Sequence, residues 1–264
     1  MNRTNFFANL KKSTSIFKGK FTQSQVNGIN SILDACVKYN VANPHHIAHI
    51  LAHVYHETGK YMSPIKETVY GTSTNKNPTD SIVIKRLNTA WAKGQLSWVS
   101  TPYWKDGWFG RGQIQITHKN NYDKLGKKIG VDLVSNPSLA LDINNSAAIA
   151  VLGMRDGDFT GKKLSDYAFP QALDADWQNH PRRIVNGKDG TDVNIKKYHL
   201  SFYTALIDAG YKATTPKPTV TIAPSATSPS APTQTANEFV IAPKISHNFV
   251  EALIAILKQL FKGK

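Results

Sequence analysis

Two glutamates, Glu57 and Glu67, are the residues whose types and spacing indicate chemistry in this chain. Glu57 follows an apolar repeat typical of a helix, and it falls at the border of the apolar face near the negative end of the helix dipole, where the anion is disfavoured. Glu67 follows Pro64, which ends a helix, and has Lys66 beside it, so nothing local opposes its ionisation. Two carboxyls with different pKa values are what acid/base hydrolysis of a glycosidic bond requires.

Two other interpretations apply to the same stretch. A glutamate near a helix end is most often a solvated surface residue, so the spacing alone does not establish a site. His49, His53 and His56 lie on adjacent helical turns and could ligate zinc. The signature H-E-x-x-H, however, requires a second histidine where this chain has Lys60. The sequence therefore favours packing and hydrogen-bonding roles for the imidazoles, and we predict no metal and no cofactor.

Local signals predict the helices that must position the two carboxyls. Asn43 can cap the helix that leads to Glu57, with Pro44 at its first position and Gly59 after its end. Thr22 can cap an earlier helix. The helical segments expected from apolar periodicity are residues 22–40, 80–93, 145–155, 165–173 and 192–209.

Residues 108–126, WFGRGQIQITHKNNYDKLG, show a different pattern. Ile114 and Ile116 alternate with Gln113, Gln115 and Thr117, as in a short strand with one apolar and one polar face. We expect the polar face to line a cleft. The nearby aromatic residues fit a local core or platforms for sugar rings equally well, and they are Trp98, Tyr103, Trp104 and Trp108. The later stretch RRIVNGKDG, residues 182–190, reads on its own as a loop.

Composition restricts the class of protein and its partners. With 264 residues, 41% of them hydrophobic and 10% aromatic, the chain can bury a core, and one domain with an appendage is expected. The net charge of +14 suits an anionic partner, and because the basic residues are scattered without a nucleic-acid-binding signature, we predict no nucleic acid. Cys36 is the single cysteine, so an intrachain disulfide is excluded, and its helical neighbours place it in the core.

Four motifs in order, YHETG, a second glutamate, GRGQIQIT with NNY, and RRIVNG, resemble those of family 19 glycoside hydrolases. They are most similar to the phage endolysins of that family. The resemblance covers roughly residues 20–210. It implies a mostly α, lysozyme-like hydrolase domain of two lobes with a sugar cleft between them, and hydrolysis of β-1,4 bonds with inversion.

The resemblance also implies roles for individual residues. Glu57 resembles the general acid, Glu67 the general base, and Thr117 the hydroxyl that helps the base to hold the attacking water. The residues expected to contact sugar are Gln115, Asn121, Tyr122, Asn186, Arg183 and Trp108. In plant chitinases the second glutamate lies farther along the chain and disulfides are common. The short spacing here, together with the single cysteine, favours bacterial peptidoglycan over chitin, and a chitinase or a non-catalytic wall-binding or virion-structural module are the alternatives.

The expected domain organisation has four parts. They are a basic N-terminal segment (1–20), the hydrolase domain (21–212), a Pro/Thr/Ser/Ala-rich linker (213–244) and a cationic amphipathic helix (245–264). The last helix is too short to span a bilayer, so we expect it to lie in an anionic membrane interface, with docking on a protein as the alternative. Its membrane-contacting residues would be Phe249, Leu253, Leu257, Lys258, Phe261 and Lys262.

The N-terminal twenty residues lack the apolar core of a signal peptide. We therefore expect the protein to be made in a host cytoplasm, to pass a permeabilised membrane, and to act on glycan strands at the cell wall or in the periplasm. We expect it to be a monomer.

Overall fold

The computed structural model describes residues 1–68 and 78–212, and within these ranges the chain is mostly α-helical. The seven α-helices of these two ranges are α1 (Arg3–Lys12), α2 (Gln23–Lys38), α3 (Pro44–Glu57), α4 (Asp80–Ala92), α5 (Lys119–Ile129), α6 (Ile143–Asp156) and α7 (Asp192–Asp208). Short 3-10 helices are η1 (Phe17–Gly19), η2 (Pro137–Leu141), η3 (Leu164–Asp166), η4 (Gln171–Asp174) and η5 (Pro181–Ile184). Strands β1 (Ile65–Lys66) and β2 (Arg111–Gly112) form an antiparallel ribbon, with Ile65 opposite Gly112. None of the helices in the described ranges is long and apolar enough to cross a membrane.

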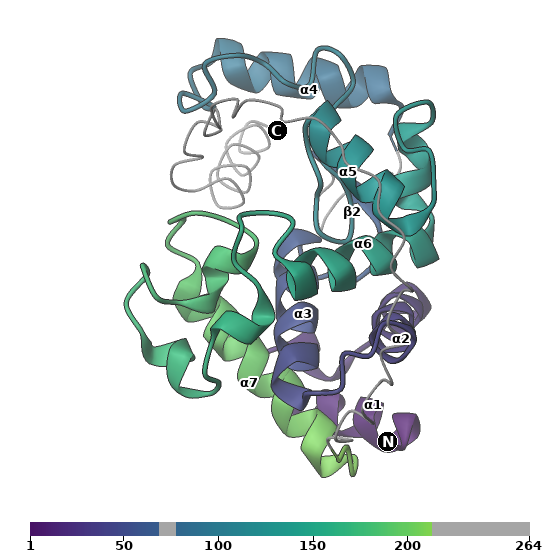
Figure 1. Ribbon diagram of the computed structural model, residues 1–264, viewed down its shortest axis with the longest axis vertical. Helices are drawn as coiled ribbons and strands as arrows, with labels where there is room; N and C mark the ends of the chain where they lie inside the picture. The colour runs from purple at the N-terminus through teal and green to yellow at the C-terminus, as the bar shows by residue number, and fades with distance from the viewer. Residues whose placement is uncertain (69–77, 213–264) are drawn as a thin grey trace, which may run out of the picture.

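The helices form two lobes, as the resemblance implies (Figure 1). One lobe holds α1, α2, α3 and α7, the other holds α4, α5 and the β ribbon, and α6 lies where the two meet. The buried apolar side chains form two separate clusters, and the larger one reaches from the first lobe into the second through Tyr122 and Leu125 of α5. The smaller cluster lies against α4 and consists of Val83, Leu87, Ala90, Leu96, Trp104 and Phe109. The mostly helical, two-lobed fold is confirmed.

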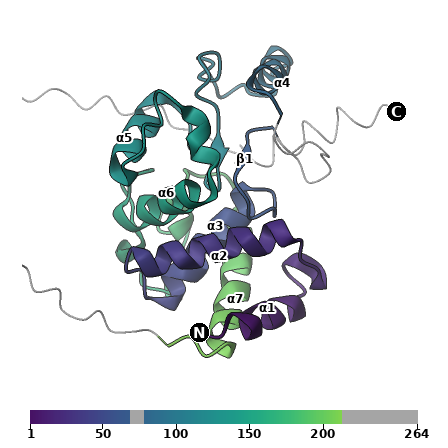
Figure 2. The same cartoon turned by 90° about the vertical axis from the view of Figure 1, so that its right-hand side faces the viewer.

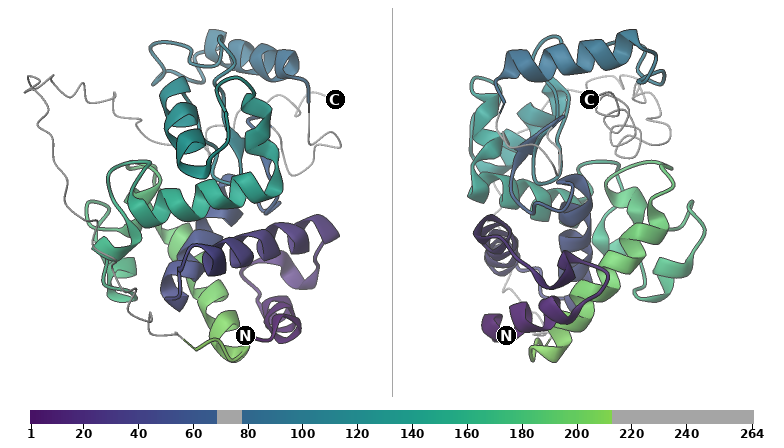
Figure 3. Two further views of the ribbon diagram at one scale, coloured as in Figure 1. Left: turned by 45° about the vertical axis from the view of Figure 1, so that its right-hand side comes forward. Right: turned by 180° about the vertical axis from the view of Figure 1, so that it is seen from behind.

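Helix α3 is the central element of the larger lobe. The Asn43 side chain accepts a hydrogen bond from the His45 N–H at 2.9 Å, and Pro44 occupies the first turn, so the predicted N-terminus is confirmed. Every residue from Ile47 to His56 is buried, and the helix packs most extensively along α7 (Figure 3). Gly59 follows the end with φ +55°. Glu57, the last residue of α3, thus follows ten consecutive buried residues of the helix.

Most of the predicted helices are confirmed, and one is wrong. Thr22 and Gln25 form a reciprocal capping box at the start of α2, while α4, α6 and α7 lie where periodicity places them. The expected helix at 165–173 is replaced by η3 and η4. Pro170 lies between these two turns, where it removes a backbone donor and restricts Phe169, so one continuous helix cannot form.

The N-terminal twenty residues are part of the larger lobe. Phe6 and Leu10 of α1 are fully buried, and α1 packs against α7 (Figure 2). Arg3 donates to Asn30 of α2 at 3.0 Å and pairs with Asp34. The predicted linker and cationic helix, residues 213–264, lie outside the described residues.

The alternation at 113–117 is not a strand with two faces. Arg111 and Ile116 exchange both backbone hydrogen bonds, at 3.2 and 3.1 Å, so the chain turns back tightly between them, with Gln115 at φ +55°. Gln113 is fully buried, and its amide donates to the carbonyls of Gly28 and Met62 at 3.1 and 2.6 Å. Gln113 therefore ties this turn to the larger lobe and does not line an open surface.

Gly28 marks the closest approach of α2 to the segment after α3, and Gly28→Ala is expected to destabilise the fold. A Cβ at this position would lie 2.1 Å from the Met62 carbonyl oxygen, so the two segments must separate and the Gln113 hydrogen bonds must lengthen. We expect a loss of about 2 kcal/mol or more in the free energy of unfolding, measured by urea denaturation. The neighbouring exposed Asn27→Ala is the control and should change it by less than about 0.5 kcal/mol. Equal stability of the two variants would contradict the close approach.

Candidate active site

Glu57 is held in place by a buried arginine. Its side chain is only 6% exposed, and Oε1 accepts a hydrogen bond from Nη1 of Arg182 at 2.7 Å. Burial raises the pKa of the Glu57 carboxyl, and the charge and hydrogen bond of Arg182 offset part of that rise. The rise in the pKa of Glu57 is expected from the sequence, whereas its contact with a guanidinium is not.

Arg182 comes from η5, in the stretch that reads as a simple loop. The Nε and Nη2 atoms of its guanidinium contact Oδ2 of Asp189 at 2.9 and 2.5 Å. Asp189 also accepts from the backbone N–H and hydroxyl of Thr191, at 3.0 and 2.6 Å. Although burial opposes its ionisation, Arg182 and these hydrogen bonds lower the pKa of Asp189. One guanidinium thus binds two carboxyls, and it donates two hydrogen bonds to Asp189 but one to Glu57. A proton in this group is therefore favoured on Glu57.

Glu67 differs from its sequence-based expectation. Its side chain is 1% exposed, Oε1 accepts from the Tyr103 hydroxyl at 2.8 Å, and Oε2 accepts from the Gly110 N–H at 2.8 Å. Burial raises the pKa of Glu67 to about 7, because these hydrogen bonds and Arg111 compensate only in part. The prediction that Glu67 ionises freely is therefore wrong. Lys66 does not help, since neighbouring side chains in a strand face opposite sides and its ammonium pairs with Asp80 at 2.7 Å.

Several other predicted residues surround the ribbon that carries Glu67. The Gln115 amide donates to the carbonyls of Ile65 and Gly112, at 3.0 and 2.7 Å, and so ties the turn to both strands. Thr117 and Asn121 are partly buried at the start of α5, where the Asn121 amide donates to the Thr117 carbonyl at 2.9 Å. Gln115 is therefore bonded to the ribbon directly, while Thr117 and Asn121 are bonded to each other just after it in the chain.

The remaining predicted polar residues lie near Arg182. The Asn186 amide donates to Oδ2 of Asp189 at 3.2 Å, so it belongs to the group that holds Glu57. Arg183 points elsewhere, with its guanidinium 5.7 Å from the ring centre of Trp177. The structure thus gathers Glu57 and Asn186 around one arginine, and Glu67 and Gln115 around the ribbon. The end of α3 and the ribbon lie next to each other where the lobes meet (Figures 1 and 2).

Two of the aromatic residues, Tyr122 and Trp104, have structural roles. Tyr122 is fully buried, and its hydroxyl donates to the Phe109 carbonyl at 2.7 Å and accepts from Arg111 at 3.0 Å. The expectation that Tyr122 contacts a sugar is therefore wrong for this conformation. Trp108 is partly buried and packs edge-on against Tyr122 at 5.4 Å, while Trp104 is at the centre of the smaller cluster. The local-core interpretation holds for Trp104.

Arg182, Asp189 and Tyr103 are the candidate functional residues that sequence reasoning misses. Arg182 and Asp189 lie in the same short stretch as the predicted Arg183, but only the η5 turn determines which of the two arginines points inward. A proline at the first position of that turn was the available signal. Tyr103 is expected only as a core residue or sugar platform, and its contact with Glu67 could not be predicted because the two residues are 36 positions apart in the chain.

Comparison with known families agrees with the motif resemblance. Residues 32–152 match the family model described as chitinase class I, which is glycoside hydrolase family 19. The matched segment is somewhat less than half of the chain and contains both Glu57 and Glu67. Over these residues the match agrees with the resemblance to family 19 glycoside hydrolases, whereas the endolysin branch remains a prediction.

Individual relatives match over short segments. Acidic endochitinase Q of Nicotiana tabacum is 56% identical over 34 residues, which is 13% of this chain and 13% of that protein. Endochitinase 4 of Solanum tuberosum is 59% identical over 32 residues, 12% of this chain and 11% of that protein. The chain thus spans 11 to 13% of the length of these relatives.

Solved structures are matched over a longer part of the chain. Chitinase C from Streptomyces griseus is 17% identical with a TM-score of 0.47, and the match covers 80% of this chain and 77% of that one. A bacterial family 19 chitinase is 19% identical with a TM-score of 0.43, and the match covers 80% and 96%.

The burial of Glu67 predicts a stability effect that depends on pH. Since the folded pKa, about 7, is above the ordinary 4.5, the folded protein is favoured while this carboxyl is protonated, and stability falls as pH rises through 4.5 to 7. In Glu67→Gln the amide can accept from Gly110 and donate to Tyr103, so it resembles the protonated form. Urea denaturation should show the variant equal to the parent near pH 4 and up to about 3 kcal/mol more stable at pH 8.

The control for this measurement is the exposed Asp208→Asn, which should leave the pH dependence unchanged. A Glu67→Gln variant that gains nothing between pH 4 and pH 8 would show that the carboxyl is ionised at little cost.

Proposed function

We propose that this protein hydrolyses β-1,4 glycosidic bonds of an N-acetylhexosamine polymer with inversion, with Glu57 as general acid and Glu67 as general base. The observation that carries the proposal is a pair of buried carboxyls held by separate sets of donors, within the segment that matches family 19. Inversion requires a water between the carboxyls, so we predict a separation of roughly 6.5–9.5 Å between them in the substrate complex.

The Arg182 contact suits Glu57 to donate a proton. Because Oε1 accepts from Arg182, we assign the acidic proton to Oε2. When that proton moves to the leaving-group oxygen, the resulting carboxylate already has a buried guanidinium in contact with it. Charge that develops during the reaction is then stabilised by a group that need not move.

The surroundings of Glu67 suit a general base. A base works best when its pKa is close to the working pH, and burial raises the pKa of Glu67 to about 7. Tyr103 and Gly110 fix the carboxylate, and burial favours the neutral form once a proton is taken from water. We propose that Thr117 helps to hold this water. The residues that we propose as sugar contacts are Gln115, Asn121, Asn186, Arg183 and Trp108.

Bacterial peptidoglycan is the substrate that we propose, with the protein acting as a lytic enzyme at the cell wall. The short spacing of the glutamates and the net charge of +14, which suits an anionic wall, support this choice. Chitin is the second candidate, because the matched family is described as a chitinase and the curated relatives are named endochitinases. Both polymers contain the same β-1,4 linkage, so only a measurement of turnover on each polymer can decide between the two substrates.

The catalytic assignment is tested with Glu57→Gln and Glu67→Gln in the full chain. Each should lower the rate at least about 10²-fold, because each removes one proton-transfer group, whereas Thr117→Ala should be milder. New reducing ends are measured on purified sacculi and on soluble chitin oligomers, with Asp208→Asn as the control. NMR before mutarotation should show the α-anomer as the first product.

Each outcome decides a separate part of the proposal. A first product with the β-anomer, or a Glu67→Gln enzyme as fast as the parent, would contradict the inverting pair. Turnover of chitin with sacculi untouched would assign a chitinase. Binding to sacculi without new reducing ends from either polymer would assign a wall-binding module.

We also propose that residues 245–264 bind an anionic membrane surface, as their sequence pattern suggests. Leu253→Glu with Leu257→Glu should abolish sedimentation with anionic vesicles while hydrolysis of isolated sacculi continues, because apolar area is lost from the interface. Ala255→Glu is the matched control, because helical periodicity places Ala255 on a stripe with Glu251, Lys258 and Lys262. Undiminished vesicle binding by the double variant would exclude this role.

A further inference from the structure

Four buried or half-buried imidazoles form a continuous hydrogen-bonded series that ends at the arginine beside Glu57. Nδ1 of His45 is 3.1 Å from Nε2 of His199, and Nδ1 of His199 is 3.2 Å from Nδ1 of His49. Nε2 of His49 is 3.1 Å from Nε2 of His53, and Nδ1 of His53 is 2.9 Å from Nη1 of Arg182. His45 is partly exposed, so the series runs from the surface to the candidate active site.

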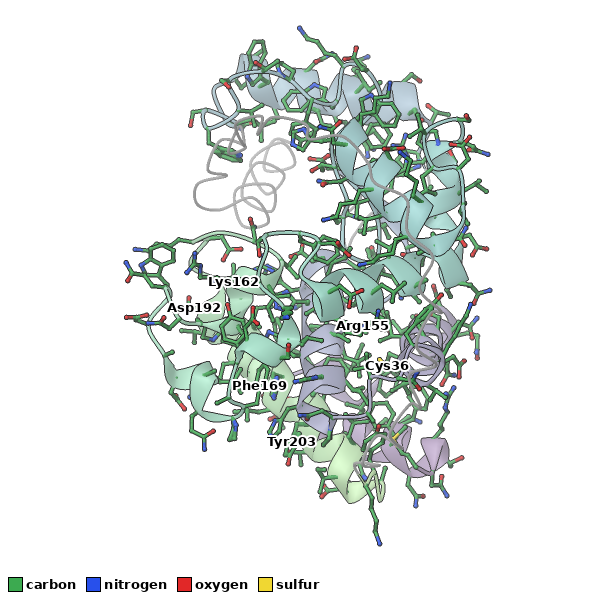
Figure 4. The ribbon with its side chains drawn as sticks, viewed as in Figure 1. Cys36, Arg155, Lys162, Phe169, Asp192 and Tyr203 are labelled. Carbon is green, nitrogen blue, oxygen red and sulfur yellow. The ribbon has the colours of Figure 1, made fainter. Side chains whose placement is uncertain are left out.

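The fold places these rings in line. His45, His49 and His53 are four residues apart and occupy one face of α3, while α7 supplies His199 from the adjacent helix. Two aromatic rings, labelled in Figure 4, fix the planes of the outer imidazoles. Tyr203 stacks on His45 at 3.9 Å between centroids, and Phe169 stacks on His199 at 5.2 Å.

The arginine sets the direction of every hydrogen bond in the series. A guanidinium can only donate, so Nδ1 of His53 must be an acceptor, and the proton of this neutral ring is on Nε2. His53 therefore donates to Nε2 of His49, whose proton is on Nδ1 and points at His199. His199 then donates from Nε2 to Nδ1 of His45. Each ring has one tautomer that satisfies both neighbours.

One further contact bears on this order. The Pro181 carbonyl lies 3.2 Å from Nε2 of His49, and it would favour a proton on that nitrogen. In that arrangement the Nε2 proton of His53 would face a second N–H with no acceptor. Because Arg182 cannot accept, the arginine end of the series determines the order, and Pro181 remains a weaker competitor.

We propose that His53 is a positioning residue for Glu57, acting through Arg182, and that the outer imidazoles keep His53 in the tautomer that this task needs. Nη1 of Arg182 carries two protons, and it contacts both Nδ1 of His53 and Oε1 of Glu57. If residue 53 accepts one of these Nη1 protons, the other Nη1 proton points at the carboxyl of Glu57. The catalytic part of this inference rests on the proposed function, whereas the hydrogen-bond order does not.

The charges around His53 keep the ring neutral. From α3 it faces His49 and His56, and from the η5 segment it faces His180 and Arg182. The carboxyls of Glu57 and Asp189 contact the arginine and not the imidazole. Burial, and then these neighbours, lower the pKa of His53 well below its ordinary value, while the pKa values of His49 and His199 fall to about 3 and about 2. A protonated His53 would set two cations against each other.

The order of hydrogen bonds is tested on the unaltered full chain with 15N-labelled histidine. Nitrogen chemical shifts distinguish N–H from lone-pair nitrogen in each ring. At pH 7 we expect the Nε2–H tautomer for His53 and His199, and the Nδ1–H tautomer for His49. A charged His53, or a His53 with its proton on Nδ1, would overturn the inference, whether or not the protein hydrolyses a glycan.

The positioning role is tested with His53→Leu and His53→Gln. Leucine removes the acceptor, while glutamine can accept from Arg182 and donate to His49. In the leucine variant we expect the carbon-13 titration of Glu57 to move to higher pH, because the arginine is less well directed at it, and kcat to fall about tenfold or more with KM within about twofold. The glutamine variant should restore both.

His46→Gln is the matched control, since His46 lies on the same helix outside the series, and it should change neither quantity. A folded leucine variant with an unmoved Glu57 titration would overturn the positioning role, as would equal effects of leucine and glutamine. If the parent has no hydrolytic activity, the Glu57 titration still decides the inference, so its failure and that of the proposed function are distinguishable.

Discussion

The arrangement of the larger lobe depends on the buried contact between Arg182 and the two carboxyls of Glu57 and Asp189. A guanidinium that is 3% exposed is stable in the interior only if its charge and donors are satisfied, and here every contact has a matching oxygen or nitrogen. The contact joins the last residue of α3 to the η5 turn, which are far apart in the chain. A tight helix end, a short turn and a proton-donor site are thereby fixed at the same point.

Glu67 is held by a different kind of contact from that of Glu57. Where Glu57 is in contact with a cation, Glu67 accepts hydrogen bonds from neutral groups, a hydroxyl and a backbone N–H, and the positive charge of Arg111 adds to their stabilisation of the anion. The nearest cations, Lys66 and Arg111, pair with Asp80 instead. The two carboxyls of the proposed pair therefore respond to burial in different surroundings, and this is a physical basis for unequal roles.

The sequence predicts those features that depend on neighbours along the chain. The cap at Asn43, the capping box at Thr22 and the periodicity of α7 involve residues within one or two turns, and the structure confirms them. Features that depend on distant partners could not be predicted. Whether Glu67 is solvated depends on Tyr103 and Gly110, and the polar role of Gln113 is fixed by Gly28 and Met62. The motif resemblance pointed to the segments that contain Glu57, Glu67 and Arg182, but it could not show which of two adjacent arginines points inward.

The two separate apolar clusters have a consequence for how the protein unfolds and loses activity. Glu57 ends α3, whose apolar side chains belong to the large cluster, whereas Tyr103 and Gly110, the donors to Glu67, lie beside the six-residue cluster against α4. Few buried contacts give a low free energy of local opening, so α4 and the segment packed on it can unfold as a separate unit while α3, α5 and α7 stay intact. On heating, the proposed base would then lose its surroundings before the molecule loses most of its helix, and inactivation would be a partial and reversible unfolding event.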